Sequence, residues 1–295
     1  MLTLEYLGEL LEKHRADAAL PVREFAIGGR SFAFNSRPAI MGVVNLSTDS
    51  WYRESVCHTA DLAIRRGRVL HEQGADIIDI GAESTLAHAA RLDESGQSTK
   101  LLPVLRGLRQ AGALVSIETY HLPVTRACLE AGANVLNLTG TEKTAEFYRM
   151  VADHDAAVII CHVQGPNVRE VGDYDFTADP IGPMVEYFSR QIEIATRNGI
   201  KKILVDPGLG FYYRNLQDSA VRVRHQMSVF LNSFRLRRLG FPICHALPHA
   251  FEFFGEEVRC AEPFFCVLAA LGKTSLFRTH EVPRVKGVLD TLGIF

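Results

Sequence analysis

The sequence lacks the signatures of several protein classes. None of its six cysteines is paired in a C-x-x-C motif, and several lie in apolar runs, which favours the reduced, buried thiols of a cytoplasmic protein over a disulfide framework. The formal net charge is only −2, so neither nucleic acid nor a membrane surface is indicated as a partner. The leucines of the first 20 residues have helical spacing, but Glu5, Glu9 and Glu12 interrupt them, which argues against a signal peptide or membrane span.

What the sequence has is a regular alternation of short apolar runs, each ending in polar residues, with room for a helix between most of them. The predicted strands are Ala39–Asn45, Ile77–Ile80, Leu114–Ile117, Val135–Leu136, Ala157–Cys161, Ile203–Val205, Pro242–Cys244 and Leu276–Phe277. Six glycines fall between a helix and the next strand, where a left-handed helix cap is expected: Gly74, Gly112, Gly132, Gly199, Gly240 and Gly272. This rhythm predicts an α/β protein with a (β/α)8 TIM barrel.

The 295-residue length leaves room for an extension before such a barrel, which typically has about 250 residues. The leucine-containing start predicts a helix, and Glu24–Phe34 alternates apolar and polar residues around Gly28-Gly29, as a β-hairpin does. The hairpin would plug the closed end of the barrel. No repeat or linker indicates a second domain, so we expect an N-terminal helix and hairpin extension over residues 1–36 and one barrel over residues 37–295.

Helical spacing predicts eight helices in the barrel. They are Thr59–Gln73, Leu101–Ala111, Pro123–Ala131, Lys143–Asp153, Pro180–Asn198, Asp218–Leu239, Cys260–Leu271 and Pro283–Leu292. Because the site of a (β/α)8 barrel is built at the carboxyl ends of its strands, function should be read from the residues that follow them.

Three neighbouring strand ends carry Glu118, Asn137 and Asp206. Carboxylates accept hydrogen bonds from paired N–H donors, and an Asn amide both donates and accepts, so this set suits an amide-bearing heterocycle. Each residue also has a plainer interpretation. Glu118 and Asn137 are compatible with solvated loop residues, and Asp206-Pro207-Gly208 with an ordinary turn.

The last strand is followed by Arg278-Thr279-His280, with Asn45 at the end of the adjoining first strand. Arg278 and His280 are two residues apart and therefore share one side of an extended segment, which predicts an anion clamp. The alternative is that Arg278 is an ion-pair partner of Glu281 or another acid.

As an ordered set, these motifs resemble the pterin-binding (β/α)8 barrel family, and within it the dihydropteroate synthases. The resemblance runs from about Arg37 to the C-terminus and is carried by Ile40–Asn45, Gly74–Thr85, Val115–Thr119, Asn137, His162–Gly165, Asp206–Phe211 and Arg278–Val282. It implies a transferase of folate biosynthesis that binds a pterin on Glu118, Asn137 and Asp206. It further implies that Asn45, Thr85, Arg278 and His280 hold a pyrophosphate leaving group, with Mg²⁺ at Asn45, and that the protein is a homodimer.

The departures from the family pattern cluster on the side of the second substrate. Leu86 stands where the family has an arginine, and Pro248-His249-Ala250 replaces Ser-Arg-Lys. Glu118 and Glu281 each replace an aspartate, and Val163 replaces a methionine. The residues that match the family's pterin and leaving-group positions are thus identical or chemically similar, while the residues that the family uses for p-aminobenzoate are replaced.

Several functions are therefore compatible with the sequence. The first is an active pterin transferase that displaces pyrophosphate from hydroxymethyl-dihydropterin diphosphate by p-aminobenzoate or a different amine, and the second is a non-catalytic or regulatory pterin-binding paralogue. A methyltetrahydrofolate-binding methyltransferase domain is disfavoured, because a methyl donor has no diphosphate for Arg278 and His280 to hold. A metal-dependent hydrolase barrel is suggested only by histidines and an acid near strand ends, namely His162, Asp206, His245, His249 and His280.

Overall fold

Eight parallel strands form the centre of the computed structural model, which describes residues 1–50, 52–84, 86 and 89–294. The strands are β3 (Ala39–Asn45), β4 (Ile77–Gly81), β5 (Val115–Thr119), β6 (Val135–Leu138), β7 (Ala157–Cys161), β8 (Ile203–Asp206), β9 (Cys244–Ala246) and β10 (Leu276–Thr279). Their order is β8-β7-β6-β5-β4-β3-β10-β9, and a parallel bridge between Val205 and Ile243 joins the two ends of the sheet. The predicted (β/α)8 barrel is confirmed.

The strands are recognisable in the sequence because they are buried on both faces. All five residues of β7 and all four of β6 are buried, so these segments read as continuous apolar runs rather than as an alternation. β9 lies two residues later than the predicted Pro242–Cys244.

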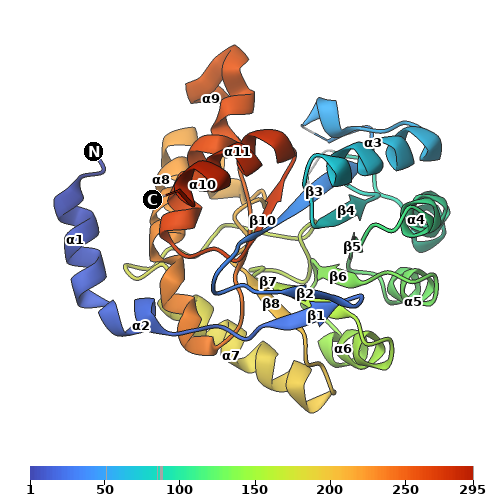
Figure 1. Cartoon of the computed structure of the whole chain (residues 1–295), viewed down its shortest axis with the longest axis horizontal. Coiled ribbons are helices and arrows are strands. Elements are labelled where there is room, and N and C mark those ends of the chain that lie inside the picture. Colours follow the sequence, from blue (N-terminus) through green and yellow to red (C-terminus); the bar gives the residue numbers. More distant parts are fainter. Residues whose placement is uncertain (51, 85, 87–88, 295) are drawn as a thin grey trace.

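A ring of helices covers the outside of the barrel (Figure 1). These helices are α3 (Ala60–Glu72), α4 (Glu94–Gln110), α5 (Leu122–Glu130), α6 (Thr144–Asp153), α7 (Gly182–Arg197), α8 (Ser219–Asn232), α10 (Ala261–Leu271) and α11 (Val282–Leu292). The short α9 (Phe251–Phe254) and 3₁₀ turns at Arg53–Ser55, Arg214–Leu216 and Gly255–Cys260 lie in the connections. None of the described helices combines the length and the apolar character that crossing a lipid bilayer requires.

Two helix predictions need correction. α4 begins at Glu94 rather than at Leu101, because Asp93 caps it by accepting a hydrogen bond from the Gly96 N–H at 2.7 Å, while its first turns are polar and carry no apolar periodicity. The helix predicted over Asp218–Leu239 is α8 followed by a 3₁₀ segment over Ser233–Leu239.

The predicted glycine caps hold at five of the six positions, where φ is positive. Gly272 is the exception, since its φ is −79° and Lys273 takes the left-handed conformation instead. Glycine is required at position 272 for another reason. A Cβ there would lie 1.9 Å from the carbonyl oxygen of Phe230 in α8, so α8 and α10 approach each other through this point.

The N-terminal residues form α1 (Leu4–Lys13), α2 (Arg15–Ala19) and a two-stranded hairpin of β1 (Phe25–Ile27) and β2 (Arg30–Phe32). The hairpin crosses one end of the barrel, whereas α1 lies at its periphery (Figure 1). Ile27, Phe32 and Phe34 are buried in one cluster with residues near the start of the strands, among them Met41 and Ile77. The hairpin therefore covers the amino-terminal end of the barrel, as the sequence predicted, and leaves the other end for a site.

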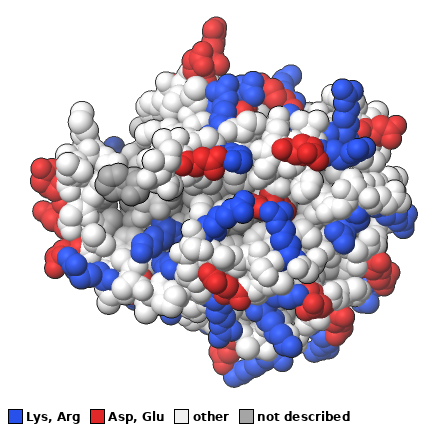
Figure 2. All heavy atoms as spheres, viewed as in Figure 1, with Lys and Arg blue, Asp and Glu red and all other residues white. Residues whose placement is uncertain are grey.

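Charged side chains of both signs are interspersed over the face that carries the hairpin (Figure 2). One ion pair anchors the hairpin, with the Arg30 guanidinium 2.5 Å from Asp76, which in turn accepts a hydrogen bond from the Ile40 N–H at 2.9 Å. All six cysteines are free thiols, and all except the partly buried Cys260 are buried.

Candidate active site

One pocket lies where the strands end, and it is lined by every described residue that the sequence nominated for the site. Its empty volume is about 900 Å³, including the open mouth. The nominated residues in its wall are Asn45, Glu118, Asn137, Asp206, Arg278 and His280. Thr85, nominated for the leaving group, lies outside the described residues. Strand ends from β3 to β10 thus bring together positions that are up to 235 residues apart, since 280 − 45 = 235.

Glu118, Asn137 and Asp206 lie on the consecutive strands β5 and β6 and on β8, and they are largely withdrawn from water. Asp206 accepts a hydrogen bond from the Gly208 N–H at 2.8 Å. Glycine is needed at position 208 because φ is +77° and a Cβ there would lie 2.3 Å from the His162 carbonyl oxygen. Burial raises the pKa of Asp206 to about 6, against this hydrogen bond. Burial likewise raises the pKa of Glu118 to about 7, although the nearby Arg278 opposes it.

Arg278 is the counter-ion of these acids. Its Nε donates to Asp79 at 2.7 Å and its Nη2 donates to Glu118 at 2.6 Å. Burial disfavours the charge of Arg278, but the two carboxylates outweigh burial and raise its pKa. Arg278 therefore has acid partners, and these are Asp79 and Glu118 rather than Glu281.

Asp79 was missed by the sequence reasoning. It is fully buried in β4, where it also accepts a hydrogen bond from the Asn137 amide at 3.3 Å. Its Oδ1 has no hydrogen-bond partner among the residues that the structure describes. The signal was an acid inside the apolar run Ile77-Ile78-Asp79-Ile80, because a buried charge in a strand needs a partner.

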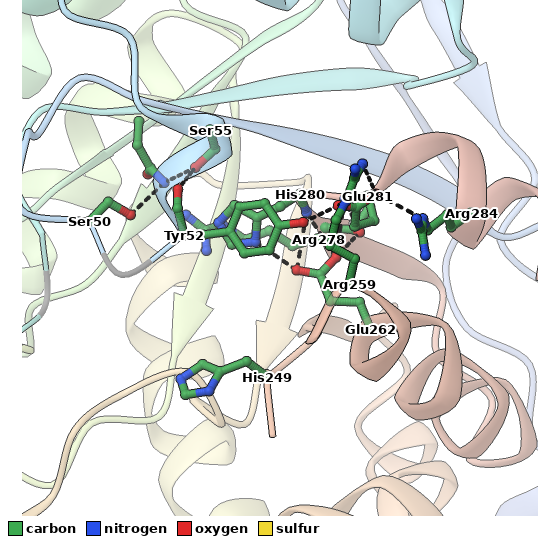
Figure 3. Close-up of polar contacts among 12 residues, drawn as sticks. Ser50, Tyr52, Ser55, His249, Arg259, Glu262, Arg278, His280, Glu281 and Arg284 are labelled. Atoms are coloured by element: carbon green, nitrogen blue, oxygen red, sulfur yellow. Dashed lines mark hydrogen bonds and ion pairs between the residues drawn. The ribbon is translucent and has the colours of Figure 1, made fainter. Parts of the chain in front are cut away.

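His280 follows β10 and is held by Glu262 of α10, whose carboxylate lies 2.7 Å from His280 Nδ1. Figure 3 shows the ring of Tyr52 stacked on the imidazole, with centroids 4.5 Å apart. A carboxylate at Nδ1 fixes which ring nitrogen carries the proton and directs the other for use elsewhere. Glu262 and Tyr52 are further residues that the sequence did not nominate.

Asn45 ends β3 with its amide fixed by two serines. Its Nδ2 donates to Ser50 at 2.9 Å and to Ser55 at 2.6 Å. Because both hydroxyls take up the nitrogen, the amide oxygen is left as the acceptor atom of this side chain.

Two basic side chains line the pocket, His249 and Arg222, and His249 lies in the segment Pro248-His249-Ala250 that departs from the family pattern. His249 lies 3.0 Å from the hydroxyl of Tyr212, and burial lowers the pKa of His249 to about 4, so the imidazole is neutral at pH 7. Arg222 lines the same pocket but is paired with Glu252 at 2.9 Å.

The loop after β4 is tied down by Arg169. Its guanidinium donates to the carbonyl oxygens of Ser84 and Ala89, each at 2.7 Å, and also to the carbonyl of Leu86. The backbone at Leu86 is therefore positioned by an arginine from the loop after β7.

The histidines in the described part of the chain do not assemble into a metal centre. Burial lowers the pKa of His162 to about 4 and that of His245 to about 3, and His245 is fully buried beside the Ser233 hydroxyl at 2.6 Å. Across the described ranges, no three His, Cys, Asp or Glu side chains are grouped so as to hold a metal ion. The hydrolase alternative gains no support from this arrangement.

Comparison with known proteins gives a consistent picture. The model of the pterin binding enzyme family matches residues 41–240. The dihydropteroate synthase of Synechocystis sp. is 28% identical over 270 residues, which is 87% of this chain and 89% of that protein. The structure of Xanthomonas albilineans dihydropteroate synthase with 4-aminobenzoic acid is similar with a TM-score of 0.76 and 26% identity, over 92% of this chain and 98% of that one. The same enzyme in complex with 7,8-dihydropteroate gives a TM-score of 0.74.

Proposed function

The chain belongs to the pterin binding enzyme family and is a dihydropteroate-synthase-like pterin transferase, and on that premise we propose that it displaces pyrophosphate from hydroxymethyl-dihydropterin diphosphate by an amine. The amine is p-aminobenzoate or a different nucleophile. The observation that carries the proposal is the gathering of Glu118, Asn137 and Asp206 in one pocket with Asn45, Arg278 and His280.

The pterin ring would bind to the acidic part of this pocket. A ring N–H beside an exocyclic amine offers paired donors to a carboxylate, and Asn137 provides both a donor and an acceptor. Arg278 neutralises only part of the charge of Asp79, Glu118 and Asp206, so an N–H-rich ring is favoured over an anionic one at this point.

The leaving group would lie at Asn45 and His280, with Arg278 contributing positive charge. The bond between the pterin methylene carbon and the diphosphate oxygen breaks, and its electron pair leaves with the pyrophosphate. The amine nitrogen forms the new bond to that carbon with its lone pair and gives up a proton to solvent water. His280 is oriented by Glu262 through Nδ1, and in its doubly protonated form it would donate a hydrogen bond from Nε2 to the charge that develops on the departing oxygen.

Mg²⁺ belongs to this proposal, and Asn45 would be its protein ligand. An oxygen ligand at this position suits the ion, because Mg²⁺ is commonly held by one or two protein oxygens together with substrate phosphates. The amide nitrogen of Asn45 donates to Ser50 and Ser55, so its amide oxygen would be the ligand atom. The ion would offset charge on the diphosphate.

We further propose a cytoplasmic homodimer. Six free cysteines are typical of a reducing compartment. Phe264 and Leu271 on α10 and Leu292 on α11 have exposed fractions of 41%, 53% and 42%, which supports an interface through these helices. Light scattering of the purified protein measures the mass directly, and a monomer at micromolar concentration would contradict the dimer.

A non-catalytic pterin-binding paralogue is the second candidate, and a specific observation favours it. His249 is neutral and Arg222 is paired, so neither supplies a free cation on the side where the family's lysine stood.

Titration calorimetry with hydroxymethyl-dihydropterin diphosphate and Mg²⁺ tests the pterin assignment common to both candidates. Asp206→Asn should weaken binding by about tenfold to a hundredfold, since it weakens a hydrogen bond to a charged acceptor. Asp290→Asn, an exposed position on α11, is the matched control and should leave binding unchanged. Absence of binding to the unsubstituted protein would refute the assignment.

A further inference from the structure

Tyr52 connects two parts of the pocket that are far apart in the sequence. It lies just before the 3₁₀ turn η1 (Arg53–Ser55), in the connection between β3 and α3, yet it is 98% buried because it packs against the end of β10. Its hydroxyl donates a hydrogen bond to Glu281, and its ring stacks on His280 with an angle of 19° between the planes (Figure 3).

The acceptor of this hydrogen bond is itself rigidly held. Arg259 donates to both carboxylate oxygens of Glu281, at 2.5 and 2.9 Å, and Arg284 lies 3.3 Å away. The Glu281 N–H donates to the Thr279 hydroxyl at 2.9 Å. A phenol that donates to a carboxylate fixed on several sides has little freedom to move away from it.

The segment that contains Tyr52 is also hydrogen-bonded to Asn45. The Ser55 hydroxyl accepts from the Asn45 amide at 2.6 Å and donates to the carbonyl oxygen of Tyr52 at 2.8 Å. The Cys57 N–H also donates to the carbonyl of Asn45 at 2.8 Å. The orientation of the Asn45 amide thus depends on where segment 52–58 is held.

We propose that Tyr52 is a positioning residue, which fastens segment 52–58 to the end of β10 and thereby holds Asn45 and His280 in a fixed relation to each other. The inference rests on the proposed function for its consequence, because Asn45 and His280 are the residues assigned to the diphosphate. Loss of the fastening should impair recognition of the diphosphate and leave recognition of the pterin ring intact.

Tyr52→Phe removes the hydroxyl and keeps the stacked ring. In the ligand-free protein, hydrogen exchange of the hydrogen-bonded amides of Ser55, Val56 and Cys57 should accelerate by about tenfold, as expected when a hydrogen bond to a charged acceptor is lost. Tyr6→Phe, on the exposed face of α1, is the matched control and should exchange like the unsubstituted protein.

Binding is then compared for two ligands that differ only in the diphosphate. Tyr52→Phe should weaken binding of hydroxymethyl-dihydropterin diphosphate with Mg²⁺ by about tenfold and leave hydroxymethyl-dihydropterin unaffected. Equal weakening of both ligands, or unchanged exchange of segment 52–58, would overturn the inference. Failure of the unsubstituted protein to bind either ligand would refute the proposed function, while the exchange measurement would still decide whether Tyr52 fastens the segment.

Glu281→Asp provides a second route to the same result, since it retracts the carboxylate by one methylene but keeps its charge. It should reproduce the effect of Tyr52→Phe on diphosphate binding, and the double variant should be no worse than either single one. Additive losses in the double variant would show that the two residues act separately and would contradict the proposal.

Discussion

The surroundings of Asp206 and Glu118 raise the pKa of both carboxyl groups. Asp206 is buried and the Glu118 side chain is 13% exposed, both groups have a raised pKa, and the charge of Arg278 opposes the rise in each. A carboxyl group in this condition binds N–H donors best once it has lost its proton. Ionisation of these two carboxyl groups should therefore strengthen ligand binding and lower the free energy of unfolding.

Pterin binding should depend on pH in the range where Asp206 ionises. Glu118 has a pKa of about 7 and Asp206 a pKa of about 6, so affinity for hydroxymethyl-dihydropterin should begin to fall below about pH 7 and should fall by at least about tenfold per pH unit below pH 6. Calorimetry in buffers of different ionisation enthalpy measures both the affinity and the protons released on binding. An affinity that rises as the pH falls would contradict this assignment.

Stability of the ligand-free protein should show the reverse dependence. A raised pKa means that the folded state favours the protonated acid, so this contribution is fully present below the usual pKa of 3.8 and is lost as the pH rises through about 6. Asp206→Asn stays neutral and should raise the free energy of unfolding by about 2 kcal/mol at about pH 8, with the gain vanishing near pH 4. Chemical denaturation at both pH values measures this, and Asp290→Asn should show no such gain.

At the scale of elements, the contact between α8 and α10 depends on Gly272. Gly272→Ala should lower the free energy of unfolding by about 3 kcal/mol, because the added methyl group meets the Phe230 carbonyl at 1.9 Å. Gly287→Ala, on the exposed face of α11, should instead raise it by about 0.5–1 kcal/mol, because beyond the nearby backbone of its own helix no atom of the described residues lies within 4 Å of the added Cβ. Denaturant melts distinguish the two, and equal effects would refute the steric explanation.

The elements that sequence reasoning placed correctly are those whose signal is local. Buried parallel strands such as β7 are continuous apolar runs, and positive φ at Gly112 follows from its place after a helix. The start of α4 and the role of Gly272 were not predictable in this way. The first depends on a cap before a polar turn, and the second on a carbonyl of a different helix.

The same division applies to the site. Glu118, Asn137 and Asp206 could be nominated because each follows a strand. The hydrogen-bond and ion-pair partners of the nominated residues could not be predicted, because they come from distant parts of the chain. Arg278, for example, pairs with Asp79, which is 199 residues away. Tyr52, which meets Glu281 from 229 residues away, is a further case.

At the scale of the whole molecule, the hairpin closes the end of the barrel opposite the site. Phe32→Ala should lower the free energy of unfolding by about 3 kcal/mol, since this buried ring packs against the bottom of the barrel. Leu4 on α1 is 82% exposed, so Leu4→Ala should change the free energy of unfolding by less than about 0.5 kcal/mol. Thermal unfolding of the two variants tests this difference, and similar melting temperatures would mean that the hairpin is dispensable for the barrel.

The proposed displacement of pyrophosphate by an amine is the central claim, and one reaction tests it most directly. Purified protein is mixed with hydroxymethyl-dihydropterin diphosphate and Mg²⁺, and pyrophosphate release is measured with and without p-aminobenzoate. We expect release that depends on an added amine, with p-aminobenzoate the first to be tried and other amines tested in the same assay. Tight binding of the pterin diphosphate with no release in the presence of any amine would contradict the transferase and establish the non-catalytic alternative.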